Sequence, residues 1–167
     1  MLTAIFARDK NGIIGIDNDI PWSIEEDFLY FKEKTFNSNV IMGRKTWDSL
    51  PKRPLPGRNN FILSSHEYGE WSNGATVIKN IEEIPNEGYI IGGSQIYKET
   101  LPLCSSILET VVNISSNTDS KVVSYAPTIN RNEFKITHES KPIDVINRKT
   151  GIPLSIIFRE WERINTY

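Results

Sequence analysis

The chain has 167 residues, with 19 lysines and arginines against 21 aspartates and glutamates and a formal net charge of −2. This length suits one domain, and the balanced charge, without runs of one sign, argues against a nucleic-acid-binding protein. No stretch approaches the roughly 20 apolar residues of a membrane span, and the apolar run 2–7 is too short for a signal peptide. The single cysteine, Cys104, cannot form an internal disulfide, which fits a reducing compartment. We expect a soluble, cytoplasmic protein with one domain over residues 1–167 and no membrane contact.

Eight short apolar runs bounded by turn residues predict strands, because they are short and rich in β-branched residues. They cover residues 2–7, 39–42, 59–63, 75–78, 88–91, 107–114, 133–137 and 154–158. Helical patterns separate the first five, at about residues 24–34, 45–50, 81–84 and 95–101. This alternation predicts a mostly parallel α/β sheet, and the last three runs should include an antiparallel pair.

The helix over residues 24–34 has the clearest predicted boundaries. Ser23 and Glu26 have the spacing of a capping box, and Lys32 and Lys34 suit the negative end of the helix dipole. The preceding loop, residues 11–22, is long and partly apolar. Such a loop inside a compact domain is more often functional than idle.

Asp27 falls at the edge of the predicted apolar stripe of this helix. At about 100° per residue, Ile24, Phe28 and Phe31 share one face, and Asp27 lies about 60° from Ile24. A carboxylate there is costly unless something pairs with it. Two interpretations remain open: the residue stabilises the positive helix end, or it pairs with a ligand in an apolar pocket that raises its pKa.

Two glycine-marked segments join a predicted strand to a predicted helix. Gly92 and Gly93 follow the strand 88–91, and the residues 43–46 (Gly-Arg-Lys-Thr) follow the strand 39–42. Free backbone amides and the helix dipole at such a junction favour a phosphate. Each segment alone is equally well a tight turn, whereas the two together indicate a dinucleotide, although the G-x-G-x-x-G fingerprint is absent.

Arg58 follows the proline-rich turn of residues 54–57. An arginine held in this way suits bidentate recognition of a carboxylate, and an ordinary surface arginine is the alternative. His66 and His138 have no partners at ligand spacing, so no metal site is expected. Of the four tryptophans, we expect all but Trp22 to be structural.

Six segments, in order along the chain, resemble motifs of the dihydrofolate reductase family of the bacterial or phage type. Residues 14–22 resemble its mobile active-site loop, residues 27–32 its substrate helix and residues 54–58 its carboxylate-binding turn. Its cofactor segments resemble residues 40–47, 63–65 and 91–97. The resemblance covers nearly the whole chain and is strongest in the first hundred residues.

The resemblance implies a single α/β domain with a central eight-stranded, mostly parallel sheet, an antiparallel C-terminal strand and helices on both faces. It implies reduction of 7,8-dihydrofolate to 5,6,7,8-tetrahydrofolate with NADPH, by hydride transfer to pterin C6 and protonation at N5. It also implies a cis peptide between Gly92 and Gly93. We expect a monomeric oxidoreductase of one-carbon metabolism and a target of antifolates.

The resemblance assigns three groups of residues. The catalytic group is Asp27, which would hold the pterin amidine edge, Thr110, which would support it, and Trp22. The substrate-binding group is Ile5, Phe31, Lys32, Leu50, Leu55, Arg58 and Ile91, with Arg58 on the glutamate α-carboxylate. The cofactor-binding group is Ala7, Ile14, Gly15, Asn18, Gly43, Arg44, Lys45, Thr46, Leu63, Ser64, Ser65, Lys79, Gly92, Gly93, Ser94, Gln95, Ile96 and Tyr97.

The chain departs from the family pattern at several positions. Residues 123–127 read Val-Ser-Tyr-Ala-Pro where the family usually has Asp-Thr-x-Phe-Pro, so the acid that would steady the mobile loop is missing. Gln95 replaces an often basic residue, which leaves Arg44, Ser65 and His66 for a 2′-phosphate. Phe6 stands where the family often has a small residue.

Two rival functions remain. A riboflavin-pathway pyrimidine reductase of the same fold would need neither Pro21-Trp22 ahead of Asp27 nor Arg58. A non-catalytic nucleotide-binding or structural protein would not need Asp27, Arg58 and Thr110 together with both glycine segments.

Overall fold

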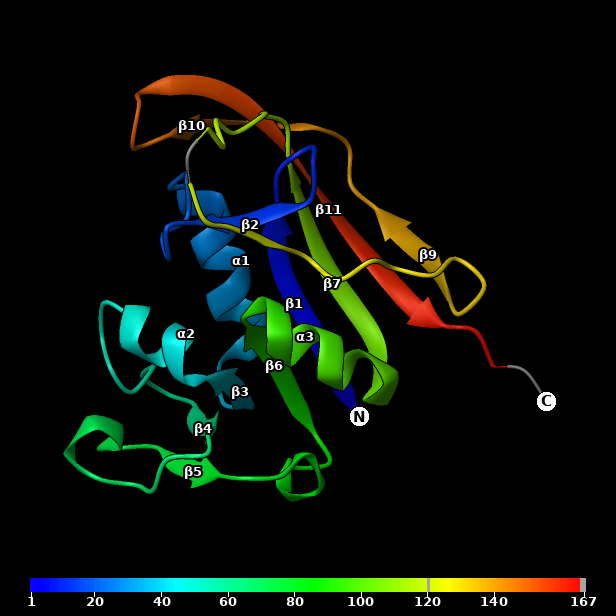
Figure 1. Ribbon diagram of the computed structural model, residues 1–167. Helices are drawn as coiled ribbons and strands as arrows, with labels where there is room; N and C mark the ends of the chain where they lie inside the picture. Colours follow the sequence, from blue (N-terminus) through cyan, green and yellow to red (C-terminus); the bar gives the residue numbers. More distant parts are fainter. Residues whose placement is uncertain (120, 166–167) are drawn as a thin grey trace.

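The computed structural model describes residues 1–119 and 121–165, so residue 120 and the last two residues of the predicted domain lie outside it. The strands of the main sheet are β1 (Leu2–Arg8), β3 (Asn39–Gly43), β4 (Asn59–Leu63), β5 (Thr76–Ile78), β6 (Gly88–Gly92), β7 (Cys104–Val112), β9 (Phe134–Glu139), β10 (Ile143–Asn147) and β11 (Ile152–Arg163). Eight of them follow the order β10-β11-β7-β1-β6-β3-β4-β5, and β9 also pairs with β11 (Figure 1). Two further strands, β2 (Ile13–Ile16) and β8 (Val123–Tyr125), form a separate small sheet.

The directions of the strands confirm the predicted sheet. β1 is parallel to β6 and β7, β3 to β6 and β4, and β4 to β5. β11 is antiparallel to β7, β9 and β10. Because β10 pairs with the first half of β11 and β9 with the second half, these two short strands share one edge position. The sheet therefore has the eight strand positions expected.

All eight predicted strands are present, whereas β2, β8 and β10 were not predicted. β10 contains Asp144 and Asn147, and β2 contains Gly15, which are residue types of low strand propensity. β2 and β8 are held mainly by each other, which a local apolar pattern cannot reveal.

Helices lie on both faces of the sheet, as expected. They are α1 (Glu25–Thr35), α2 (Arg44–Ser49) and α3 (Ser94–Thr100), and short 3-10 turns lie at Glu70–Ser72, Ile81–Glu83 and Leu101–Leu103. Tyr30 of α1 stacks on Phe158 with ring centroids 4.1 Å apart, and Phe6 meets Tyr97 of α3 at 5.4 Å. Phe158 and Phe6 pair with consecutive residues of β7, so they point to opposite faces. No helix in the described part of the chain is long and apolar enough to cross a membrane.

The start of α1 differs from the prediction. The helix begins at Glu25, no side chain caps it, and the predicted capping box between Ser23 and Glu26 is wrong. The backbone N–H of Ser23 donates to Asn147 Oδ1 at 3.1 Å, and its carbonyl accepts the Arg148 N–H at 2.8 Å. These contacts hold Ser23 against the β10–β11 turn, outside the helix.

The core is continuous on the α3 face and divided on the α1 and α2 face. The α3 face carries one cluster, which includes Ala4, Phe6, Ile90, Ile107 and Trp161. The other face carries two clusters, one of Trp22, Ile24, Val112, Val145 and Ile156, and one of Val40, Met42, Trp47 and Ile62. Ile5 and Phe31 belong to neither of these two clusters.

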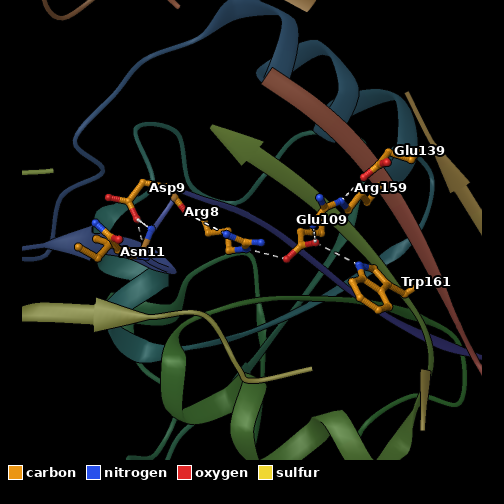
Figure 2. Close-up of polar contacts among 8 residues, drawn as sticks. Arg8, Asp9, Asn11, Glu109, Glu139, Arg159 and Trp161 are labelled. Carbon is orange, nitrogen blue, oxygen red and sulfur yellow. Dashed lines mark hydrogen bonds and ion pairs between the residues drawn. The ribbon is translucent and has the colours of Figure 1, made fainter. Parts of the chain in front are cut away.

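A row of charges crosses four adjacent strands near the α3 face (Figure 2). Glu109 of β7 is 2% exposed and accepts hydrogen bonds from Arg8 Nε at 2.7 Å and from Trp161 Nε1 at 3.1 Å. Arg159 lies 3.5 Å from the same carboxylate and also pairs with Glu139 of β9. A buried carboxylate is tolerated only when donors surround it, and Glu109 meets that condition.

Removing the charge of Glu109 should therefore destabilise the sheet. Glu109→Gln leaves Arg8 and Arg159 without their shared partner, and we expect a loss of roughly 3 kcal/mol in the free energy of unfolding. This loss lies at the low end of the range for a broken buried ion pair, because both arginine side chains are 22% exposed and can be hydrated in the variant. Urea denaturation measures the loss. Glu25→Gln, which removes an exposed pair with Arg148, is the matched control and should cost less than about 1 kcal/mol.

Candidate active site

The predicted site residues gather at one edge of the sheet, where four parallel strands end. Ala7 lies near the end of β1, Gly92 ends β6, Gly43 ends β3 and Leu63 ends β4. In open α/β sheets, the carboxyl ends of parallel strands are the usual place for a ligand. The structure thus brings together segments that are up to 85 residues apart in the chain (Ala7 to Gly92).

Asp27 lies in the first turn of α1 and faces β7. Thr110 Oγ1 donates a hydrogen bond to Asp27 Oδ1 at 2.8 Å. Ile24 is buried and Phe31 half-buried, but Phe28 is 57% exposed, so only part of the predicted apolar stripe packs. Burial raises the pKa of the Asp27 carboxyl from 3.8 to about 6, and the hydrogen bond from Thr110 opposes that rise. These contacts favour a ligand-pairing carboxylate over a simple charge at the helix end.

The two glycine-marked segments lie side by side. Met42 pairs with Gly92 between β3 and β6, and the peptide between Gly92 and Gly93 is cis, as the resemblance implied. A Cβ at Gly43 would lie 3.1 Å from Ile96 Cγ1, and one at Gly92 would lie 3.2 Å from Thr46 Oγ1. Gly92 also has φ +130°, a conformation that favours glycine. Close approach of the two segments therefore favours glycine at both positions, most strongly at Gly92.

Arg44 is held in place by its neighbours at the start of α2. Its guanidinium lies 3.8 Å from the centre of the Trp71 ring, and its Nε contacts Asp48 at 3.3 Å. Asp48 also lies 3.7 Å from Arg53. The sequence did not indicate that Trp71 would contact Arg44, because the two are 27 residues apart.

Two other side chains predicted to bind the cofactor form contacts with neighbouring side chains of the same chain. Gln95 Nε2 donates to Glu99 Oε1 at 2.6 Å along α3, and Lys79 pairs with Glu67. The segment Leu63, Ser64 and Ser65 leaves the end of β4 next to these residues, and the Ser64 N–H donates to the Ile78 carbonyl. Two further predicted members of this group, Lys45 and Ser94, lie in the first turns of α2 and α3.

Arg58 is presented by a turn that buried polar groups shape. Its Nε donates to the Pro56 carbonyl at 2.8 Å, and its Nη1 donates to Thr35 Oγ1 at 3.2 Å. Asn60, which is buried, accepts the Leu55 N–H and donates to the Leu55 and Arg58 carbonyls. Burial lowers the pKa of the Arg58 guanidinium, which nevertheless stays charged. Thr35 and Asn60 were missed from the sequence, although a polar residue at a buried strand position is a usable signal.

The loop between β1 and α1 is tied to the rest of the site through β8. The N–H of Asp17 donates to the Val122 carbonyl at 2.8 Å, and Asp17 Oδ1 accepts the Val122 N–H at 2.9 Å. Ser94 Oγ donates to the Tyr125 carbonyl at 2.7 Å, which joins β8 to the start of α3. The acid expected near residues 123–127 is absent, and Asp17 on the loop itself makes the contact instead. Asn18, with φ +62°, lies at the exposed tip.

Several predicted site residues are mainly part of the core. Trp22 is 4% exposed and packs with Ile24 and Val112. Tyr97 is 3% exposed, and its hydroxyl donates to the Ile5 carbonyl at 2.6 Å, so it positions the end of β1. Three partly buried residues pack against the cluster of Val40 and Met42, namely Leu50, Leu55 and Ile91. Ile14 packs against the cluster on the α3 face, and Ala7 packs against the cluster of Trp22 and Ile24. Lys32 is exposed on α1. Within the described ranges, no three His, Cys, Asp or Glu side chains converge as a metal ion would require.

Comparison with known proteins gives a consistent result. The dihydrofolate reductase family model matches residues 1–162. The dihydrofolate reductase of Neisseria meningitidis serogroup B is 39% identical over 140 residues, which are 80% of this chain and 83% of that protein. The Bacillus subtilis dihydrofolate reductase is 38% identical over 119 residues, which are 68% and 70% of the two chains. A solved structure of dihydrofolate reductase from Enterococcus faecalis, complexed with NADP(H) and RAB-propyl, superposes on this chain with a TM-score of 0.82. The two sequences are 27% identical, and the match covers 99% of this chain and 97% of the Enterococcus chain.

The raised pKa of Asp27 predicts how stability depends on pH. In the folded chain the carboxyl holds its proton up to about pH 6, whereas the unfolded chain loses it near 3.8. This stabilising contribution is therefore complete below about pH 4 and is lost as the pH rises through about 6. Asp27→Asn, which stays neutral, should gain stability over the wild type as the pH rises from about 4.5 to about 7.5. Urea denaturation across that range measures the difference, and a difference that does not change with pH would refute the assignment.

Proposed function

Because the chain belongs to the dihydrofolate reductase family, we propose that the site at the carboxyl ends of β1, β3 and β6 reduces 7,8-dihydrofolate to 5,6,7,8-tetrahydrofolate with NADPH. The observation that carries this proposal is the carboxylate of Asp27. It is half-buried beside Thr110, has a raised pKa, and lies on the sheet face whose core is divided. A pterin amidine edge offers the paired donors that such a carboxylate lacks.

The chain has a surface that fits NADPH. Gly43 and Gly92 leave backbone open where two helices begin, and a Cβ at either position would crowd a neighbouring side chain. Arg44, fixed on Trp71, places one cation next to these segments, where a 2′-phosphate would need it. The cofactor supplies the hydride, and the protein supplies its placement against the substrate. Gln95 adds no charge, so we assign the preference for NADPH over NADH mainly to Arg44.

Asp27 would act through charge and position. Its carboxylate would accept two hydrogen bonds from the pterin amidine edge, while Thr110 keeps one of its oxygens oriented. A negative charge there would stabilise the positive charge that develops on the ring as N5 gains its proton. Because the site is partly desolvated, this interaction is stronger than it would be in water. Ile5, Phe31, Leu50 and Ile91 would supply the apolar walls.

The rival functions explain less of the site. A pyrimidine reductase of the same fold has no use for an arginine held by Thr35 and Pro56 at the far end of α1. A non-catalytic protein would not need to hold a half-buried Asp27 against Thr110 with part of its hydrogen-bonding capacity unused. Both alternatives are therefore disfavoured.

We also propose the extent of the domain, the location of the protein in the cell and its oligomeric state. We assign the whole span 1–167 to one reductase domain, because its N-terminal and C-terminal strands share the main sheet. We place the enzyme in the cytoplasm, where a free buried Cys104 and a dependence on NADPH both fit. We also expect it to act as a monomer.

Arg58 should recognise the glutamate tail of the substrate. Arg58→Leu removes a charged hydrogen-bond donor and should weaken dihydrofolate binding by about 1.5–3 kcal/mol. A dihydropterin that lacks the tail should lose almost nothing, and this comparison is the control. Equilibrium binding of both compounds to both proteins measures the effect. Equal losses for the two compounds would show that Arg58 has another role.

Asp27 should control the reaction through its charge. Mixed with NADPH and dihydrofolate, the wild type should consume NADPH, seen as falling absorbance at the nicotinamide band. Asp27→Asn keeps the shape but removes the charge, so single-turnover hydride transfer at neutral pH should fall by roughly a hundredfold or more. The loss should shrink as the pH falls, because substrate already protonated at N5 no longer needs the carboxylate. NADPH affinity should barely change. Parallel pH profiles for the two proteins would refute the role given to Asp27.

A further inference from the structure

Asp9 is a second buried carboxylate, located where β1 ends and the active-site loop begins (Figure 2). Asp9 is fully buried, with 0% of its surface exposed. Its Oδ1 accepts the backbone N–H groups of Asn11 at 2.8 Å and Ile13 at 2.9 Å, and its Oδ2 accepts the Ser116 N–H at 3.1 Å. One side chain thus joins the first turn of the loop to the segment that follows β7.

The backbone of Asp9 is equally engaged. Its N–H donates to the Ile13 carbonyl at 3.0 Å, and its carbonyl accepts from the Gly12 N–H at 3.1 Å and from the Arg8 guanidinium at 3.0 Å. A buried carboxylate is costly unless donors satisfy it, and here three amides do so. Together these hydrogen bonds form a compact cluster around Asp9, here called the Asp9 cluster, which fixes the direction in which the chain leaves β1.

The remainder of the loop depends on few other supports. Residues 16–21 line an open groove of about 860 Å³, whose other walls are residues 113–117 and the β10–β11 turn. The loop is held across this region by exposed polar contacts, Asp17 with Val122 and Lys149 with Asp19. Exposed pairs of this kind contribute little each. The contacts of Asp9 thus give the loop a buried polar support at its start, next to the segment that pairs with β8.

We propose that Asp9 is a positioning residue for hydride transfer: by joining Asn11 and Ile13 to Ser116, its carboxylate sets the place from which the loop closes over the nicotinamide site. This inference rests on the proposed function, because it requires the loop to cover a bound cofactor. Asp9 touches neither ligand and acts through the loop. A reacting pair displaced by about 1 Å can lose up to about a hundredfold in rate, so a small shift of this support has a measurable effect.

The test is Asp9→Asn in the full chain. The carboxamide keeps the shape of the side chain, but whichever way it turns, its NH2 group faces at least one backbone N–H that the carboxylate accepted. We expect single-turnover hydride transfer, measured with saturating NADPH and dihydrofolate and expressed per folded molecule, to fall by roughly tenfold or more. NADPH should bind more weakly. Dihydrofolate affinity should not change, because Asp27 and Arg58 are not part of the Asp9 cluster.

Two control variants separate positioning from general stability. Glu109→Gln removes another buried carboxylate, which contacts the same Arg8 but not the loop, and should lower the melting temperature without lowering the rate per folded molecule. Asp144→Asn removes an exposed charge on β10 and should change neither. If Asp9→Asn keeps the wild-type rate, or if Glu109→Gln loses as much rate, Asp9 is only structural and the proposal is overturned.

A measurement on the wild type keeps the proposal testable if Asp9→Asn does not fold. The amide protons of Asn11, Ile13 and Ser116 should exchange with a common opening free energy and gain protection together when NADPH is added. Independent exchange at the three sites would overturn the proposal. A wild type that does not consume NADPH with dihydrofolate would instead refute the proposed function, and that result is visible before any variant is compared.

Discussion

The hydrogen bond from Thr110 to Asp27 is the contact on which the organisation of the site depends. It joins the centre of the sheet to α1 and holds one oxygen of a carboxylate that forms no other hydrogen bond with the described part of the chain. Two other carboxylates, Asp9 and Glu109, are buried within the same part of the molecule, and donors from the protein surround each of them. A carboxylate accepts about four hydrogen bonds, so Asp27 retains unused capacity that a ligand can fill. This difference separates Asp27, which we propose binds the ligand, from the two acids whose hydrogen-bonding capacity is filled by the protein itself.

The asymmetry of the sheet explains why the site lies where it does. On the α3 face a single cluster of apolar side chains extends under the helix, and Phe6 packs against Tyr97 within it. On the opposite face the packing divides into two clusters, and Asp27, Phe31 and Ile5 lie in the region between them. Because the parallel strands all end at the same edge, the glycine-marked starts of α2 and α3 meet this region from the side. The pterin site and the dinucleotide site that we propose would thus share one border.

The active-site loop shows how the same task can be performed by different residues. The family usually has an acid in the segment that corresponds to residues 123–127, and this chain has none there. Asp17 on the loop itself accepts the Val122 N–H here. At its two ends the loop is held by Asp9 and by the β10–β11 turn, through Asn147 and Lys149. The loop is therefore secured by polar contacts at its start, middle and end, and the acceptors at the start and the end, Asp9 and Asn147, are buried.

The sequence by itself determined eight of the nine strands of the main sheet, the three α-helices and the order of the proposed ligand-binding segments, whereas the fourth predicted helix, at 81–84, is a short 3-10 turn. These features depend on local periodicity and on glycine and proline, which act within a few residues. Tertiary structure alone decided the partners of the buried carboxylates: Glu109 lies 101 residues from Arg8, and Ser116 lies 107 residues from Asp9. It also decided that Ser23 binds Asn147 rather than capping α1, and that Arg44 lies on Trp71. The physical reason is that a polar group is satisfied by whatever donor the register of distant strands brings to it, and no local pattern in the chain records that register.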